Sequence, residues 1–233
     1  MPKITRRNLV AMGYVATLAR PLQACGAFGP SYTVRFRLNV RGSSRGAAMN
    51  GSSVIQSEWA DAGPLSQMGR WRATYIGEAP YIDLGQGRAL VALLGTITGY
   101  SGGFTATGGI FHEMFPDKRG KYEDAYWENL SQSSEEGDLP RKYWPLFAYF
   151  VDVKDITSAS IVSVEELENV ASVHIEQVQL QLTRDPVTEQ LGAYLPWLEQ
   201  VGKTSIRPTQ PFSMRPTFEK FDKHNFRATG DVI

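Results

Sequence analysis

The sequence predicts an α+β, β-rich fold. We expect a predominantly antiparallel sheet, sandwich-like or half-barrel-like, with two or three short helices. The 233-residue chain is 42% hydrophobic and 11% aromatic, and its valine, isoleucine, tyrosine and phenylalanine residues recur in short runs, which favours strands. Some of these runs alternate apolar and polar residues, as a strand with one buried face does. Glycine-rich stretches between runs are typical of turns.

The clearest strand covers residues 32–40. Its apolar residues occupy every second position and polar residues lie between them, so one face is expected to be buried and the other solvated. The glycine- and serine-rich stretch 42–51 is interpreted as a turn or loose loop. Residues 53–59 return as a second strand, and we expect the two strands to form a hairpin.

A second pair of strands is predicted at residues 78–84 and 88–98. The linker Gly85-Gln86-Gly87 is turn-like. The second member is mostly apolar, which predicts a central strand covered on both faces. Residues 146–153 form another strongly apolar strand.

The last clear strand covers residues 173–182. Its apolar positions change parity between Ile175 and Val178. One extra residue would explain the change, so we predict a β-bulge near Glu176 and Gln177.

Local signals predict three short helices. Residues 121–130 place apolar side chains on one face at helical spacing. Ser163 and Glu166 resemble a capping box, which predicts a helix that continues to about residue 170. Asp185-Pro186 suits the first positions of a helix that continues to about residue 194. The polar stretch 131–140 is expected to be an exposed loop.

These elements divide the chain into three parts. Residues 1–24 form a signal segment, 25–202 a β-rich globular domain, and 203–233 an extended tail that contains prolines and phenylalanines. The phenylalanines suggest that the tail packs on the domain or on a partner.

The balance of charges argues against a nucleic-acid binder. The chain has 24 Lys and Arg and 24 Asp and Glu, and four of the basic residues lie among the first 24 residues. The remainder therefore holds 20 basic and 24 acidic residues, a net charge of −4. A mildly acidic domain lacks the basic footprint that nucleic acid requires.

The beginning of the chain resembles a bacterial export signal. Basic residues precede an uncharged stretch at 9–19, which has the length of a signal-peptide core but is too short to span a bilayer. Leu22-Gln23-Ala24-Cys25 then resembles the lipobox of bacterial lipoproteins, in which the cysteine carries a diacylglyceryl group. The resemblance implies that Cys25, the only cysteine, is a lipid anchor facing the periplasm. The following Gly26 implies the outer membrane. The alternative is an irregular helix with an ordinary cysteine.

Four short blocks carry a second resemblance. They are a YRFRL-type strand at 32–38, a GSSVI block at 51–55, and the two parts of a DPVT…LPWL block at 185–188 and 195–198. Together they resemble a family of uncharacterised bacterial proteins with an exported or lipoprotein-like start. Gln56 stands where an acidic residue is usual. The family has no known activity, so the resemblance implies no site residue.

One weak catalytic candidate is present. Residues 99–103, with Ser101 at the centre, fit the G-x-S-x-G pattern of a nucleophile elbow, which needs a strand before the serine and a helix after it. His224 follows in the order that such hydrolases use, with an acid such as Asp152, Asp155 or Asp185 before it. The residues after Ser101 are a poor helix, and a plain glycine-rich turn is the preferred interpretation.

We expect no metal and no cofactor. His112 and Glu113 adjoin, but no second histidine lies four residues away. Gly85-Gln86-Gly87 lacks the third glycine or the lysine of a phosphate-binding loop.

Arg35, Arg37 and Arg41 lie on the polar face of the first strand. They form a candidate partner-binding surface. The interpretation we prefer is a solvated face whose arginines pair with acids across the hairpin.

The leading functional hypothesis is a membrane-tethered envelope protein that acts as a non-enzymatic binding or interaction module with a protein partner. An immunity or inhibitor protein is one version of it. The alternatives are a serine hydrolase that uses Ser101, and a structural or assembly protein that docks through its C-terminal tail.

Overall fold

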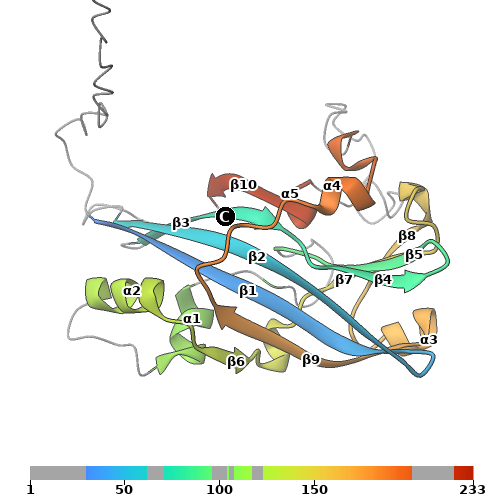
Figure 1. The fold of residues 1–233 in the computed structure, drawn as a ribbon, viewed down its shortest axis with the longest axis horizontal. Helices are drawn as coiled ribbons and strands as arrows, with labels where there is room; N and C mark the ends of the chain where they lie inside the picture. The colour runs from blue at the N-terminus through green and yellow to red at the C-terminus, as the bar shows by residue number, and fades with distance from the viewer. Residues whose placement is uncertain are drawn as a thin grey trace, which may run out of the picture.

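The computed structural model describes residues 30–61, 71–95, 104, 108–116, 123–200 and 223–232. These residues form two antiparallel sheets and several short helices (Figure 1), which confirms the predicted β-rich α+β fold. The strands are β1 (Ser31–Ser44), β2 (Ala47–Asp61), β3 (Trp71–Glu78), β4 (Tyr81–Gly85), β5 (Arg88–Ala92), β6 (Glu136–Asp138), β7 (Phe147–Phe150), β8 (Ala159–Val162), β9 (Val173–Leu182) and β10 (Arg227–Val232). The α-helices are α1 (Gly108–Met114), α2 (Glu123–Gln132), α3 (Leu167–Ala171), α4 (Leu191–Tyr194) and α5 (Lys223–Phe226), and the 3₁₀ turns are η2 (Arg141–Tyr143), η3 (Ile156–Ser158) and η4 (Leu198–Gln200).

The larger sheet has the strand order β10-β3-β2-β1-β9-β6. Its centre is the predicted hairpin of β1 and β2, which pair from Ser31 opposite Ala60 to Ser44 opposite Ala47. The turn is only two residues long, and Arg45 and Gly46 have positive φ angles of 51° and 80°. A two-residue turn of this kind matches the twist of the strands. Of the two interpretations of 42–51, the turn is confirmed, and the rest of the stretch is continuous strand on both sides of it.

Two glycines in this hairpin allow other strands to approach closely. A Cβ atom on Gly42 would overlap the carbonyl oxygen of His174 in β9. At this point the pairing slips, because Arg41 lies opposite Gln177 whereas Gly42 lies opposite Ile175. Residue 176 is therefore the extra residue, and the predicted β-bulge is confirmed. Gly51 leaves room for β4 in the same way, since its Cβ would meet Ile82.

The smaller sheet has the order β4-β5-β7-β8. The predicted hairpin is confirmed as β4 and β5, with positive φ angles at Gln86 and Gly87 in its turn. Its predicted bounds are too wide, because Glu78 belongs to β3, and β5 ends at Ala92. All four residues of β7 are buried, and so are four of the five residues of β5, as expected of central strands. β7 is shorter than the apolar run predicted. The following strand, β8, was not predicted.

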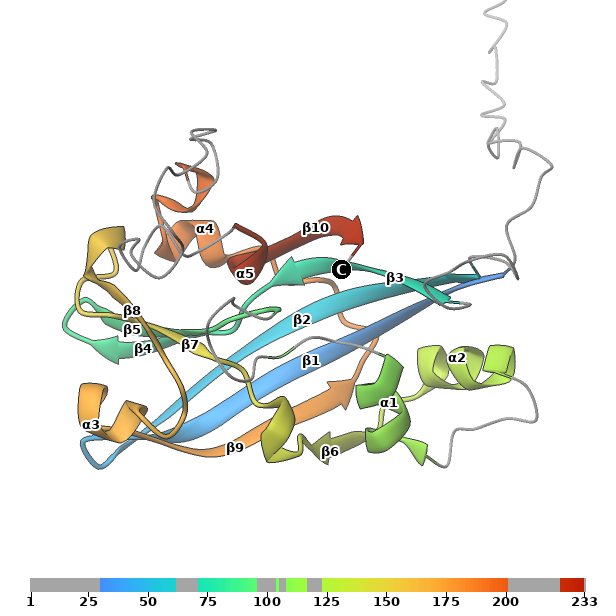
Figure 2. The same cartoon turned by 180° about the vertical axis from the view of Figure 1, so that it is seen from behind.

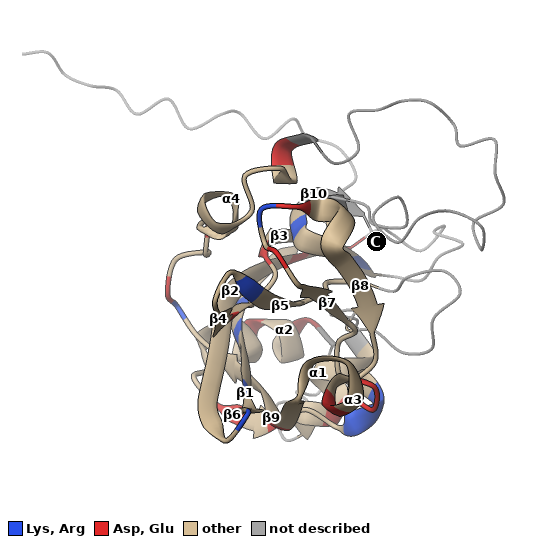
Figure 3. Cartoon of the chain, turned by 90° about the vertical axis from the view of Figure 1, so that its right-hand side faces the viewer, with Lys and Arg blue, Asp and Glu red and all other residues tan. Residues whose placement is uncertain are grey.

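The core lies between the concave face of the larger sheet and the smaller sheet with α1 and α2. Figure 3 looks along the molecule and shows the larger sheet curving around β5, β7 and α2, and Figure 2 shows α1 and α2 beside β1. Trp59 of β2 stacks on Trp127 of α2 with ring centroids 3.9 Å apart, and Phe36 of β1 meets Phe111 of α1 edge to face at 5.5 Å. Such aromatic pairs add to the burial of apolar area, so they fasten the helices to the sheet.

The helix predictions had mixed outcomes. α2 confirms the helix predicted at 121–130, with a start two residues later. α3 lies within the second prediction, and the Glu166 carboxylate accepts a 2.8 Å hydrogen bond from the Ser163 backbone N–H, which is half of the predicted capping box. The helix predicted from residue 185 is wrong, because only Leu191–Tyr194 is helical there. The stretch 131–140, expected to be a loop, contains the short strand β6.

The described end of the expected tail belongs to the domain. β10 pairs with β3 at the edge of the larger sheet, with Arg227 opposite Glu78. Phe226 is fully buried against Trp197 at 5.5 Å. A boundary at residue 203 therefore does not separate residues 223–232 from the globular domain, because a buried aromatic ring and strand pairing hold them there.

Candidate functional site

An irregular segment, which we call the strap (residues 183–190), crosses the outer face of the larger sheet. Figure 1 shows it running in front of β1 and β2 from the end of β9 to α4. Its backbone is bonded to the sheet, since Thr183 N–H donates to the Arg35 carbonyl at 3.0 Å and Thr188 N–H donates to the Val54 carbonyl at 3.1 Å. Val54 N–H in turn donates to the Thr188 hydroxyl at 2.9 Å. These bonds hold the strap in an extended path, which explains why the predicted helix does not form.

Of the three arginines of the candidate partner surface, Arg37 and Arg35 bond to the strap. The Arg37 guanidinium forms an ion pair with the Asp185 carboxylate. Hydrogen bonds from Arg37 and from Thr183 lower the pKa of the Asp185 carboxyl below its ordinary value. We expected the arginines to pair with acids on the other strand of the hairpin. Arg37 instead pairs with an acid that lies 148 positions away in the sequence.

Arg35 also bonds to the strap, whereas Arg41 is exposed. Arg35 donates from Nε to the Gln56 side-chain oxygen at 2.8 Å and from Nη1 to the Arg184 carbonyl at 3.4 Å. Arg41 lies further along β1 and is exposed. A partner surface at Arg41 stays a prediction.

A recess of about 480 Å³ lies between the strap and the edge of the larger sheet. This volume is within the usual range for sites that bind small ligands or peptide segments. We call it the strap recess. It is lined by Ile76, Gly77 and Glu78 of β3, Val187 and Glu189 of the strap, and Arg227 and Ala228 of β10.

A buried ion pair forms one side of the strap recess. The Glu78 side chain is only 2% exposed, and its Oε1 accepts from Arg227 Nε at 2.8 Å and lies 2.6 Å from Arg227 Nη2. Its second oxygen accepts from the Leu191 backbone N–H at 2.6 Å. One carboxylate thus connects β3, β10 and α4. A buried charge is tolerated only when it is paired and hydrogen-bonded. Glu78 therefore requires Arg227 beside it, and this requirement fixes the position of the guanidinium.

Arg227 has a second acidic partner. Its Nη1 donates to Glu199 Oε1 at 2.5 Å, and the Glu199 side chain is 66% exposed. Partial burial alone would lower the pKa of the Arg227 guanidinium, but the hydrogen bonds to Glu78 and Glu199 outweigh it and raise that pKa. Arg227 is therefore a permanent cation at the recess.

The four blocks of the family resemblance meet around this site. Arg35 and Arg37 of the first block and Val54 of the second contact the strap, which itself contains the DPVT part. Ser53 donates from its hydroxyl to the carbonyl of Glu78, and the LPWL part ends one residue before Glu199. The sequence blocks thus surround the recess, but none of them includes Glu78, Glu189 or Arg227. No spacing pattern could have paired Glu78 with a residue 149 positions away.

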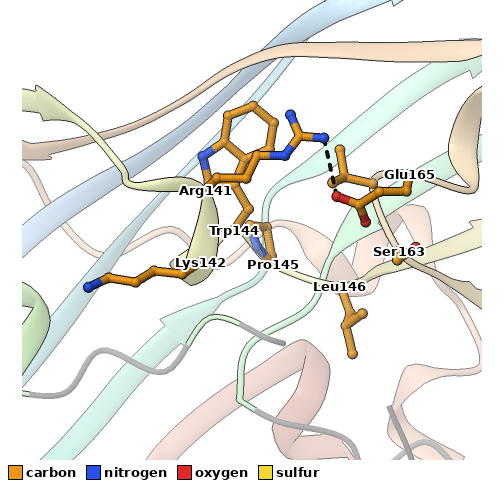
Figure 4. Close-up of a pocket in the computed structure, with 8 residues that line it drawn as sticks. Arg141, Lys142, Trp144, Pro145, Leu146, Ser163 and Glu165 are labelled. Atoms are coloured by element: carbon orange, nitrogen blue, oxygen red, sulfur yellow. Dashed lines mark hydrogen bonds and ion pairs between the residues drawn. The ribbon is translucent and has the colours of Figure 1, made fainter. Parts of the chain in front are cut away.

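A second recess, of about 350 Å³, lies between η2 and the start of α3 (Figure 4). The Arg141 guanidinium lies over the Trp144 ring, 4.5 Å from its centroid, and forms a 3.3 Å ion pair with Glu165. Lys142 points away from this pair in Figure 4 and bonds to Glu113 at 2.8 Å. Both basic side chains are more than half exposed, so these are solvated ion pairs of small energetic weight.

None of the other candidate residues that the structure describes lines either recess. Cys25 and Ser101 lie outside the described residues. His224 is half-buried on α5. His174 is exposed with Nδ1 3.5 Å from Glu168, and His112 stacks on Tyr126 with ring centroids 4.1 Å apart. Within the described part of the chain, no three His, Cys, Asp or Glu side chains gather so as to hold a metal ion.

Comparison of the chain with protein-family models, with curated proteins and with solved structures found no match. In the described ranges, no helix combines the length and the apolar character needed to cross a membrane.

Proposed function

We propose that this chain is a non-enzymatic binding module of the bacterial cell envelope, tethered by a lipid on Cys25, and that it holds a partner protein at the strap recess. The observation that supports binding is a ligand-sized recess with an ionised pair fixed at its wall. A guanidinium already held in place loses little conformational freedom when a partner binds, and such preorganisation favours affinity. An immunity or inhibitor protein that caps another protein is one version of this function.

The strap recess also offers apolar contact beside the charges. Ile76 and Val187 line it together with Arg227. Sites that combine apolar walls with a few well-placed polar groups bind specifically, because the polar groups fix the orientation of the bound group. Arginine suits this role, since its planar fork donates in a fixed geometry.

Photocrosslinking in the native envelope tests the binding site. We expect p-benzoylphenylalanine in place of Val187, on the strap, to form a discrete adduct with a partner protein. The matched control places the same group at Val170 of α3, which is 49% exposed and lies at the other end of β9. Equal adducts from both positions, or an adduct only from Val170, would contradict binding at the strap recess.

Metabolic labelling tests the anchor separately. A palmitate analogue is expected to label the protein expressed from the full sequence. The labelled protein is expected in the outer-membrane fraction. The Cys25→Ser variant should lose the label completely, because it removes the only thiol in the chain. Label that persists in Cys25→Ser, or a wild-type chain without label, would rule out the lipid on Cys25.

A further inference from the structure

We infer that Arg227, on the wall of the strap recess, binds the free carboxylate at the C-terminus of a peptide chain, and that Glu199, which pairs with Arg227 in the unbound protein, gives way to this carboxylate. The inference rests on the proposed function, because it specifies what the partner protein presents to the recess.

The pattern of hydrogen bonds on Arg227 points to this ligand. The guanidinium has five N–H groups, one on Nε and two on each terminal nitrogen. Glu78 accepts from Nε and lies against Nη2 on one side, and Glu199 accepts one N–H of Nη1. The side that carries Nη1 and Nη2 is therefore the side left for a ligand. Two parallel N–H groups on that side match the two oxygens of a carboxylate.

Glu199 is held far more weakly than Glu78. Its side chain is 66% exposed and it meets Arg227 through one oxygen, whereas the Glu78 side chain is 2% exposed and bonded through both oxygens. Exposed ion pairs contribute little to stability. Glu199 can therefore move into solvent when another carboxylate arrives, while Glu78 keeps the guanidinium in position.

The exchange leaves the number of carboxylate partners of Arg227 unchanged. Arg227 has two carboxylate partners before binding, Glu78 and Glu199. It has two after binding, Glu78 and the ligand, so no additional anion accumulates on the guanidinium. Ile76 and Val187 supply apolar contact for the last side chain of the peptide, and Glu189 supplies an acceptor for its backbone N–H groups.

The test uses an N-acetylated tripeptide that ends in valine, as the free acid and as the C-terminal amide, titrated into the full chain and followed by NMR. We expect the acid to bind at least tenfold more tightly than the amide and to shift the resonances of β3 and β10. Glu199→Gln is expected to bind the acid roughly twofold to fivefold more tightly, which is the weight of an exposed ion pair.

Two further variants complete the test. Arg227→Lys keeps a cation beside Glu78 but loses the planar fork, so it should bind the acid about tenfold more weakly. Glu165→Gln is the matched control, since Glu165 is also 66% exposed and also paired with an arginine, and it should bind like the wild type. A purely structural role for Glu199 would leave affinity unchanged or weaker in Glu199→Gln, which would overturn the inference.

The other outcomes are separable. If acid and amide bind equally and both shift the recess resonances, the carboxylate inference is overturned and binding at the strap recess stands. If neither peptide shifts any resonance, the carboxylate inference is overturned as well. The proposed function is judged by the crosslinks from Val187, which do not depend on these peptides.

Discussion

Replacement of Arg227 by alanine is expected to lower the free energy of unfolding by about 3–5 kcal/mol, because it leaves the Glu78 carboxylate buried without its counter-ion. The Glu78 side chain is 2% exposed, and Arg227 contacts it through two nitrogens. Urea denaturation measures the change as a lower transition midpoint with an unchanged slope.

Two companion variants identify the cause of this loss. The double variant Arg227→Ala with Glu78→Gln is expected to recover more than about 1 kcal/mol of it, because the neutral amide needs no counter-ion. Its oxygen can still accept from the Leu191 N–H that now bonds Glu78. The control Arg141→Ala removes an exposed pair and should cost less than about 1 kcal/mol. A loss of the same size in Arg141→Ala and Arg227→Ala would contradict the buried-pair explanation.

Replacement of Trp127 by alanine is the second change with a large expected effect, a loss of about 3–5 kcal/mol in the free energy of unfolding. Trp127 is 1% exposed. Its ring stacks on Trp59 at 3.9 Å and meets Phe111 edge to face at 6.1 Å. Alanine would leave a cavity where α2 packs on the larger sheet. Thermal or urea unfolding measures the loss.

The phenylalanine variant separates ring packing from polarity. The Trp127 indole N–H is buried and has no hydrogen-bond partner among the described residues. Trp127→Phe removes this unsatisfied donor and keeps an aromatic ring, so it should lose less than half as much as Trp127→Ala. Glu128 on the same helix is exposed, and Glu128→Ala should stay within about 0.5 kcal/mol of wild type. Less than about 1 kcal/mol lost in Trp127→Ala would mean that α2 does not share the cooperative core.

The strands could be predicted wherever one face is buried and the other is not. The alternation at 32–40 lies within β1, and the change of parity in β9 predicted a bulge near residues 176 and 177, where the strand pairing has its extra residue. The predicted bounds of β9 agree with those of the strand. These features are local, since the side chains of a strand alternate between faces regardless of what covers them.

Short edge elements could not be predicted in this way. β6 is three residues long, two of which are acidic, and its strand form depends on pairing with β9. The sequence predicted a turn or loose loop over 42–51 but not that the turn is confined to Arg45 and Gly46, because flanking glycine and serine give the whole stretch the composition of a loop. Gly42 and Gly51 are needed because a Cβ at either position would overlap a residue of β9 or β4. Those strands are distant in the sequence, so this need is visible only in the structure.

The sequence by itself determined the fold class, the central hairpin and the bulge, because these follow from local periodicity and composition. Only the tertiary structure decided the strap and its recess. Asp185 and Pro186 have the composition of a helix start, yet the backbone of the strap bonds to β1 and β2. Arg227 meets Glu78 across 149 positions. Local sequence cannot specify which distant backbone or charged group a segment will contact. The pairing of Arg227 with Glu78 follows from burial, because a buried carboxylate requires a counter-ion.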